Sequence, residues 1–355
     1  MPAFTPSPST LLLALALPSL QTARPAQHTA ALDALGRLLG RADAAAPTTL
    51  DLRSWVALQL GMPAHAPWAA AWQAFADPDA ASASAPGACL LLEPVQMVAT
   101  MNSVAMRPLP LALSAAQLEA LVELLNPIFN TDGGQLAAVA GRLLLRLAEP
   151  ADWQTTPLAQ CAGRDLRDCL PRGDEAGLLR RWMTECQMAL HRRAEQGDAL
   201  LQGVTGVWAW GEGSLATQVA AACSAGDRTG AASTRGAHAV TRAEVALFSQ
   251  DPLLGALATA RQQLALGNAA DALRSGSPAR HLVWHGGEDP AALHAVVHAG
   301  REALMRGTLR SIQVNMWLDE TAMAQAWLLR RPHLLRVWRR PVHPWDAPSA
   351  ASSLQ

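Results

Sequence analysis

The chain has 355 residues, of which 50% are hydrophobic and 16% are charged, so it is long enough to bury one large core or two smaller ones. All 28 basic residues are arginine, and neither lysine nor tyrosine occurs, which excludes mechanisms that need a lysine Schiff base, a phosphate-loop lysine or a catalytic tyrosine. The net charge of -1 and the lack of a basic cluster argue against a nucleic-acid partner.

Cysteine usage and the apolar segments bear on the cellular compartment. The five cysteines lack CxxC spacing, which indicates neither a disulfide framework nor a zinc ribbon and favours a reducing compartment. The apolar run at 11–17 follows no basic residue and stops at Pro18, so it predicts a buried strand, or alternatively a short helix, rather than a secretion signal. No apolar stretch approaches the roughly eighteen residues that cross a bilayer. We expect a cytoplasmic protein without a membrane partner.

Apolar periodicity and turn residues predict the elements in chain order. Strands are expected at 11–17, 89–92, 95–99, 109–113, 138–147, 204–210, 244–249, 281–285, 309–318 and 328–338, with a hairpin as one reading of the last two. Helices are expected at 29–39, 50–60, after the capping box of Ser114 and Gln117, and at 174–193, 216–223, 252–266 and 290–305. Alternation of strands and helices in the second half predicts an α/β protein whose mostly parallel sheet carries helices on both faces.

A glycine pair follows the predicted strand at 204–210. The segment GEGSLA at 211–216 is close to the dinucleotide fingerprint, in which glycines let backbone amides approach a pyrophosphate at a helix N-terminus. The last position is alanine, and the preceding strand is late in the chain rather than first. A structural turn is therefore favoured, and a nucleotide-binding module at Gly211 is the alternative.

One dense group of potential metal ligands follows the strand at 281–285. It comprises His285, Glu288, Asp289, His294 and His298, and the last two have the i,i+4 spacing that lets both reach one ion. Against a metal site, the proline at position 290 makes the two acidic residues natural helix caps. We expect no metal here, with manganese or zinc as the alternative.

A serine and a pair of tryptophans are further candidates for a functional role. Ser19 follows the first predicted strand, where a nucleophile could lie, but neither an acid nor a histidine stands beside it. Trp208 and Trp210 alternate on a strand, so their side chains share one face. Packing beneath a helix is the favoured interpretation of this pair, and a stacking platform is the alternative.

Three stretches carry a resemblance to a known family. The first comprises LEPVQM at 92–97, LSAAQL at 113–118, LLN at 124–126 and DG at 132–133. The second comprises ECQMALH at 185–191 and VWAWGEG at 207–213, and the third is LLRVWRRP at 334–341. In order and spacing they resemble the RpfE-type regulatory proteins of proteobacteria, which are similar to cofactor-independent phosphoglycerate mutases of the archaeal kind. The resemblance covers roughly residues 10 to 341.

The resemblance implies an alkaline-phosphatase-like α/β core formed by 1–87 and 151–341, a smaller inserted α+β domain at 88–150 and a disordered tail at 342–355. Active mutases of that superfamily use a serine nucleophile and two divalent metals, which aspartate and histidine side chains hold at strand ends. Here the first strand ends in LPSL at 17–20 without an acidic residue. The chain also departs from the family at Glu93, which replaces an aspartate, and at Glu212, which replaces a glycine.

From these departures we expect a catalytically inactive, mutase-like protein, or pseudoenzyme, that has no catalytic residues and needs no cofactor. It would act as a regulatory or ligand-binding scaffold for a protein or a small molecule. The candidate pocket residues are His191, Trp210, Gly211, Glu212 and Gly213.

Two alternatives stay open. The first is a divergent metal-dependent phosphoglycerate mutase or phosphatase, with manganese or zinc on His285, Asp289, His294 and His298. The second is the nucleotide-binding module at Gly211.

Overall fold

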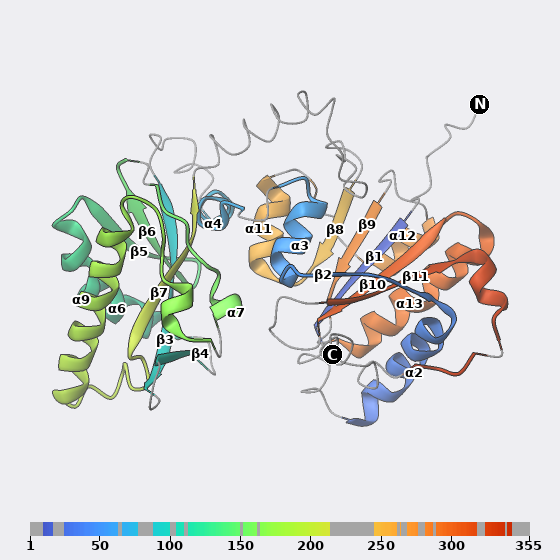
Figure 1. Ribbon diagram of the computed structural model, residues 1–355, viewed down its shortest axis with the longest axis horizontal. Helices are drawn as coiled ribbons and strands as arrows, with labels where there is room; N and C mark the ends of the chain where they lie inside the picture. Colours follow the sequence, from blue (N-terminus) through green and yellow to red (C-terminus); the bar gives the residue numbers. More distant parts are fainter. Residues whose placement is uncertain are drawn as a thin grey trace. The chain divides into compact units, whose positions relative to one another are not determined.

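The computed structural model (Figure 1) divides into two compact units, Met1–Ala64 with Thr234–Gln355 (unit 1) and His65–Ser233 (unit 2). It describes residues 10–16, 25–62, 66–76, 88–99, 104–109, 113–149, 152–161, 164–213, 245–260, 263, 268–275, 281–286, 289–317, 324–337 and 339–342. Unit 2 is longer at both ends than the inserted domain expected at 88–150, because α4 before that range and α9 and β7 after it, all introduced below, pack with its sheet. The expected tail falls almost wholly outside the described residues.

Unit 1 is built on sheet A, whose strand order is β2-β11-β10-β1-β9-β8. The strands are β1 (Thr10–Ala16), β2 (Asp43–Thr48), β8 (Val245–Ser249), β9 (His281–His285), β10 (Ser311–Trp317) and β11 (Ala324–Arg330). The four strands β8, β9, β1 and β10 are parallel, whereas β11 and β2 run antiparallel to their neighbours. The predicted mostly parallel sheet is thus confirmed, and the last two strands pair antiparallel as the hairpin prediction required. The strand expected at 328–338 is wrong in its bounds, because β11 ends at Arg330 and Arg331–Leu335 form a 3-10 helix.

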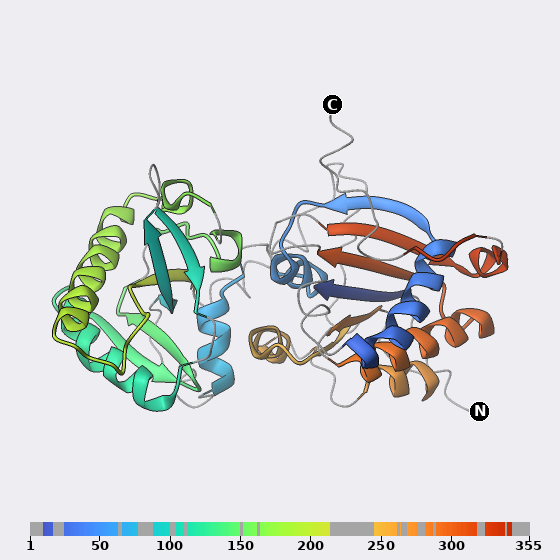
Figure 2. The ribbon, with the colours of Figure 1, turned by 90° about the horizontal axis from the view of Figure 1, so that it is seen from below.

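The two faces of sheet A have different cover. The side chains of β1 point alternately to the two faces of the sheet. On one face Leu11, Leu13 and Leu15 join a buried core with α2 (Pro25–Arg41), α12 (Ala269–Ser275) and α13 (Pro290–Arg306), which lie together in Figure 2. Helix α3 (Leu52–Gln59) contacts β1, and α11 (Pro252–Ala260) contacts both β8 and α3. Strand β11 leads into the 3-10 helix η1 (Arg331–Leu335).

Unit 2 has a separate antiparallel sheet B in the order β4-β3-β6-β5, and β7 also pairs with β3. Its strands are β3 (Cys89–Ala99), β4 (Val104–Pro108), β5 (Gly134–Val139), β6 (Arg142–Leu147) and β7 (Gly206–Gly213). Its helices are α4 (Trp68–Ala76), α6 (Ala115–Asn130), α7 (Leu158–Cys161), α8 (Leu166–Cys169) and α9 (Ala176–Glu195). Helices α6 and α9 contact one another, α6 contacts β5, and α9 contacts β7.

Four sequence predictions need correction in unit 2. The strand expected at 109–113 is not found, because β4 ends at Pro108, Leu109 and Leu113 lie in no strand, and 110–112 fall outside the described residues. The strand expected at 138–147 is a hairpin, because Ala140 and Gly141 adopt positive φ values of 47° and 83° and turn the chain within an apolar run. The strands expected at 89–92 and 95–99 are one continuous strand, β3. The strand expected at 204–210 exists as β7, but it pairs antiparallel with β3 rather than joining the parallel sheet.

Local helix signals are confirmed. The capping box of Ser114 and Gln117 begins α6, and Asp289 caps α13 through the backbone N–H of Ala291. Gly307 ends α13 with a φ of 80°, the left-handed conformation that favours glycine. The helix expected at 216–223 lies outside the described residues. No helix in the part of the chain that the structure describes has the length and apolar character of a membrane span.

Candidate functional site

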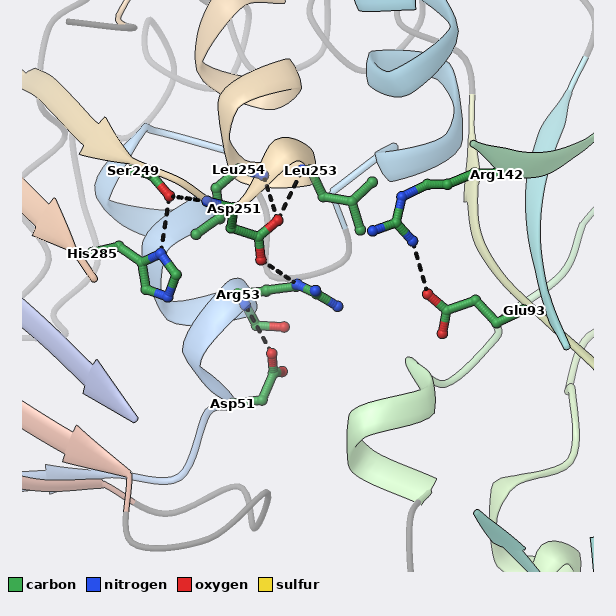
Figure 3. A network of polar contacts seen from close by, with 10 residues as sticks. Asp51, Arg53, Glu93, Arg142, Ser249, Asp251, Leu253, Leu254 and His285 are labelled. Carbon is green, nitrogen blue, oxygen red and sulfur yellow. Dashed lines mark hydrogen bonds and ion pairs between the residues drawn. The ribbon is translucent and has the colours of Figure 1, made fainter. Parts of the chain in front are cut away.

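The carboxyl ends of β8 and β9 bring together a polar group in unit 1 (Figure 3). Ser249 is the last residue of β8 and pairs in register with His285, the last residue of β9. The Oγ atom of Ser249 lies 2.9 Å from Nδ1 of His285. Because the carboxyl ends of parallel strands open at one edge of a sheet, this is the position where α/β proteins bind ligands.

Asp251 holds this group to the neighbouring helices. Its backbone N–H donates to Ser249 Oγ at 3.0 Å, and its Oδ1 accepts from the backbone N–H of Leu253 at 2.8 Å in the first turn of α11. Its Oδ2 accepts from Nε of Arg53, on α3, at 3.0 Å. Both carboxylate oxygens of Asp251 are therefore already engaged (Figure 3).

Burial sets the charge of the imidazole. Removal of His285 from water lowers its pKa to about 4, with a smaller lowering by Arg53, although the carboxylate of Asp251 acts in the opposite direction. Burial of Asp251 opposes its ionisation, but the charge and hydrogen bond of Arg53 hold its pKa below the ordinary value. At neutral pH the group therefore consists of an uncharged imidazole, an uncharged hydroxyl and a compensated ion pair.

The strand register adds a fourth residue. Ala14 of β1 pairs with His285 on one side and with Asn315 of β10 on the other. Partners in adjacent parallel strands point to the same face, so Ser249, His285, Ala14 and Asn315 form one row. We call it the polar row. The strand spacing places the backbones of His285 and Asn315 about 10 Å apart, with the methyl group of Ala14 between them.

Asn315 has an unusual environment within the polar row. It is 1% exposed, and its Oδ1 accepts from Gln313 Nε2 at 3.1 Å. Its Nδ2 is buried and, in the described structure, has no hydrogen-bond partner. A buried donor without a partner costs about 1–3 kcal/mol, so this amide is suited to an acceptor supplied by a ligand.

The acidic residues described near this edge each cap a helix. Asp51 accepts from the Ser54 N–H at 3.0 Å and caps α3, while Asp289 accepts from the Ala291 N–H at 2.9 Å and caps α13. Asp251 serves α11 and Arg53 as described above. Each carboxylate thus satisfies the backbone donors at a helix start.

The proposed metal ligands on α13 also lie apart from the polar row. His294 and His298 stack on one another with ring centroids 6.2 Å apart, and Nδ1 of His298 lies 3.4 Å from Oε1 of Glu302. Among the described residues no three histidine, cysteine, aspartate or glutamate side chains are grouped as a metal ion would require. Glu288 and the candidate nucleophile Ser19 fall outside the described residues.

The glycine pair of the dinucleotide-like motif has partners within unit 2. Gly211 N–H donates to Thr155 Oγ1 at 3.2 Å, and the Thr155 N–H donates to the Glu212 carboxylate at 2.9 Å. A Cβ at Gly211 would lie 3.0 Å from Cβ of Trp68, and the φ of Gly211 is 77°. Close helix packing and a left-handed backbone thus explain this glycine, and the carboxylate of Glu212 is unfavourable for a phosphate. Gly213 ends β7, and the helix that the motif needs lies outside the described residues.

The remaining pocket candidates lie in different environments. The side chain of His191 is 73% exposed on α9, with Nε2 3.3 Å from Oε1 of Glu195. Trp210 is 1% exposed and packs against Trp68, with ring centroids 6.4 Å apart. Trp208 is fully buried and donates from Nε1 to the Thr156 carbonyl at 2.7 Å. Packing against a helix is thus observed for Trp210, which meets Trp68 of α4, and Trp208 is buried next to Thr156.

Glu93, the residue that stands where the resembled family has aspartate, forms an ion pair in sheet B. Its Oε1 lies 3.2 Å from Nη1 of Arg142, so two adjacent strands supply the two partners (Figure 3). The ion pair with Arg142 thus gives Glu93 a structural role in sheet B.

Sequence reasoning missed Arg53, Ser249 and Asn315. The predicted strands at 244–249 and 281–285 end on Ser249 and His285, which was the available signal. The strand order that makes these ends neighbours, and that brings Asn315 into the same row, is set by contacts between distant segments.

The fold and site define an α/β protein with a mixed, mostly parallel sheet and a separate antiparallel sheet. No family model matches the sequence, and no curated protein matches it. Among solved structures the chain is similar to the cofactor-independent phosphoglycerate mutase from Thermoplasma acidophilum DSM 1728. The identity is 12%, the TM-score is 0.34, and the match covers 91% of this chain and 90% of that one. This similarity is a distant one of fold and assigns no activity.

Proposed function

We propose that this mutase-like chain acts by binding, as a regulatory or ligand-binding scaffold, and not by metal-dependent phosphoryl transfer. The observation that carries the proposal is the engagement of the carboxylates at the carboxyl edge of sheet A. Asp51, Asp251 and Asp289 each accept hydrogen bonds at a helix start, and Asp251 also pairs with Arg53.

This engagement bears directly on metal chemistry. Metal-dependent phosphoryl transfer needs carboxylates and imidazoles that bind the ions directly and so neutralise the charge of the transferring group. A cation that captured Asp251 would have to displace Arg53 and would leave that partly buried guanidinium without this carboxylate. The network therefore favours its present partners over a metal ion.

The polar row favours a particular ligand chemistry. When Ser249 donates its hydroxyl hydrogen to Nδ1 of the neutral His285 ring, Nε2 of that ring carries the remaining hydrogen and can donate. Nδ2 of Asn315 is a second donor on the same face. Because Arg53 and Asp251 compensate one another, we propose an uncharged ligand that presents a carbonyl or carboxamide oxygen. Ser249 and His285 are partly exposed, so such a ligand would enter from the β8–β9 end.

An NMR titration tests this proposal with acetamide and inorganic phosphate as probes. We expect acetamide to shift the side-chain signals of His285 and Asn315, and we expect the shift at His285 to disappear in Asn315→Leu. His294→Gln, a change on the exposed face of α13, is the matched control and should leave the response unchanged. A response to phosphate with Mn²⁺ in place of acetamide, or no response to either probe, would refute the proposal.

A further inference from the structure

A groove lies between α6 and α9 in unit 2 and encloses about 490 Å³. Helix α6 contributes Leu124 and Ile128 to its lining. Helix α9 contributes Glu185, Met188, Ala189, Arg192 and Arg193, and Gln196 follows directly after the helix. The floor is apolar, and two arginines lie at one end. Met188 is 57% exposed and lies beside the apolar side chains that line the groove.

The apolar floor is additional to the core of unit 2. Helix α6 already buries Leu121 and Leu125 completely, and α9 buries Trp182 and Cys186 completely on the face that meets its neighbours. Met188 lies outside this buried stripe, so folding does not account for its position. An apolar strip bordered by charged groups is typical of a surface that binds another protein.

The charges at the Arg192 end of the groove favour an acidic occupant. At the other end Arg181 is shared by two carboxylates, because its guanidinium pairs with Asp132 and its Nε lies 3.6 Å from Oε1 of Glu185. Arg193 lies 3.0 Å from Asp198. Nε of Arg192 donates to the Met188 carbonyl at 3.4 Å, and within the described residues Arg192 makes no ion pair. The groove therefore presents an uncompensated guanidinium beside its apolar floor.

We propose that this groove binds an amphipathic α-helix of a partner protein, with the helix's apolar face on Met188 and acidic residues toward Arg192. A furrow between two packed helices is the surface into which the side-chain ridges of a third helix fit. Methionine adapts its shape to an incoming apolar face, and arginine forms two parallel hydrogen bonds with a carboxylate. This site lies in unit 2, so it stands independently of the ligand proposed for sheet A.

Fluorescence anisotropy with two labelled synthetic peptides of about 14 residues, roughly four helical turns, tests the inference. Both peptides carry the same leucine stripe, but one has glutamate and the other has arginine beside the stripe. The full chain should bind the acidic peptide at least about tenfold more tightly than the basic one, and added salt should reduce the difference.

Three variants sharpen this test. Met188→Asp should abolish binding of the acidic peptide, and Arg192→Glu should weaken it about tenfold while improving binding of the basic peptide. Arg180→Glu is the matched control, because Arg180 is exposed on the same helix but does not line the groove, and it should change the affinity less than about twofold. Circular dichroism should show that all three variants stay folded, since each position is exposed.

Three results would overturn the inference. The first is equal binding of the acidic and basic peptides. The second is binding of the acidic peptide that Met188→Asp and Arg192→Glu both leave intact. The third is self-association in sedimentation velocity that Met188→Asp abolishes, which would assign the groove to a second copy of the chain.

Discussion

The buried imidazole of His285 makes the stability of unit 1 depend on pH. Burial lowers its pKa to about 4, compared with about 6.5 for an ordinary histidine, so between these values the unfolded chain binds a proton that the folded chain does not. The free energy of unfolding therefore falls as the pH falls through this interval. Linkage gives a loss of about 2.5 kcal/mol between about pH 7.5 and about pH 4.5. This figure is an upper bound, because part of the imidazole meets solvent, which weakens the effect.

Asp251 affects the stability of unit 1 at a lower pH than His285 does. Its pKa lies below the ordinary carboxyl value, so the stability it contributes is present above that value and is lost only under more acidic conditions. Urea denaturation followed by tryptophan fluorescence at several pH values measures the effect for wild type, His285→Gln and the control His294→Gln. Wild type and the control should lose stability in parallel, and His285→Gln should lose less over the same range, by at most about 2.5 kcal/mol. The reasoning fails if all three curves are parallel.

Further predictions concern packing and thiol chemistry. Gly40→Ala should lower the free energy of unfolding by about 1–3 kcal/mol, because its Cβ would overlap the backbone carbonyl of Arg340. At Gly177 in α9 an added Cβ would meet no atom within 4 Å, so Gly177→Ala should stabilise the protein by about 0.5–1 kcal/mol. Equal effects of the two substitutions on thermal unfolding would contradict this packing. Trp182→Ala should cost about 3–5 kcal/mol in urea denaturation, since the side chain is fully buried, and a loss below about 1 kcal/mol would count against that burial. Burial raises the pKa of Cys186 to about 12, so iodoacetamide near pH 8 should alkylate this thiol only after denaturation. Peptide mass spectrometry measures the alkylation, and a modified Cys186 in the folded protein would contradict the prediction.

Local patterns in the sequence were sufficient to predict many elements of the fold. The apolar run of β1 predicted a buried strand, and proline, an acidic cap and a terminal glycine predicted α13 almost to its ends. These signals operate within a few residues of the chain, where capping and periodicity are decided. The turn at Ala140 and Gly141 was missed, because apolar residues on both sides form one run, although the glycine inside that run is itself a turn signal.

Long-range pairing could not be predicted in the same way. The segment that forms β7 was recognised as a strand, but nothing in its composition indicated that its partner is β3. The same limit applies to the polar row, because Ser249, His285 and Asn315 become neighbours only through the strand order. Asp289 carried both a metal-ligand and a helix-cap interpretation, and its hydrogen bond to Ala291 supports the cap.

We propose that the carboxyl edge of sheet A binds its ligand without a metal ion. The sharpest test is hydrolysis of p-nitrophenyl phosphate with and without Mn²⁺ or Zn²⁺, together with elemental analysis of the purified chain. We predict no metal-dependent turnover and no stoichiometric metal in the wild-type protein. Stoichiometric metal and turnover that His285→Gln and Asp251→Asn both abolish, while His294→Gln retains them, would contradict the account.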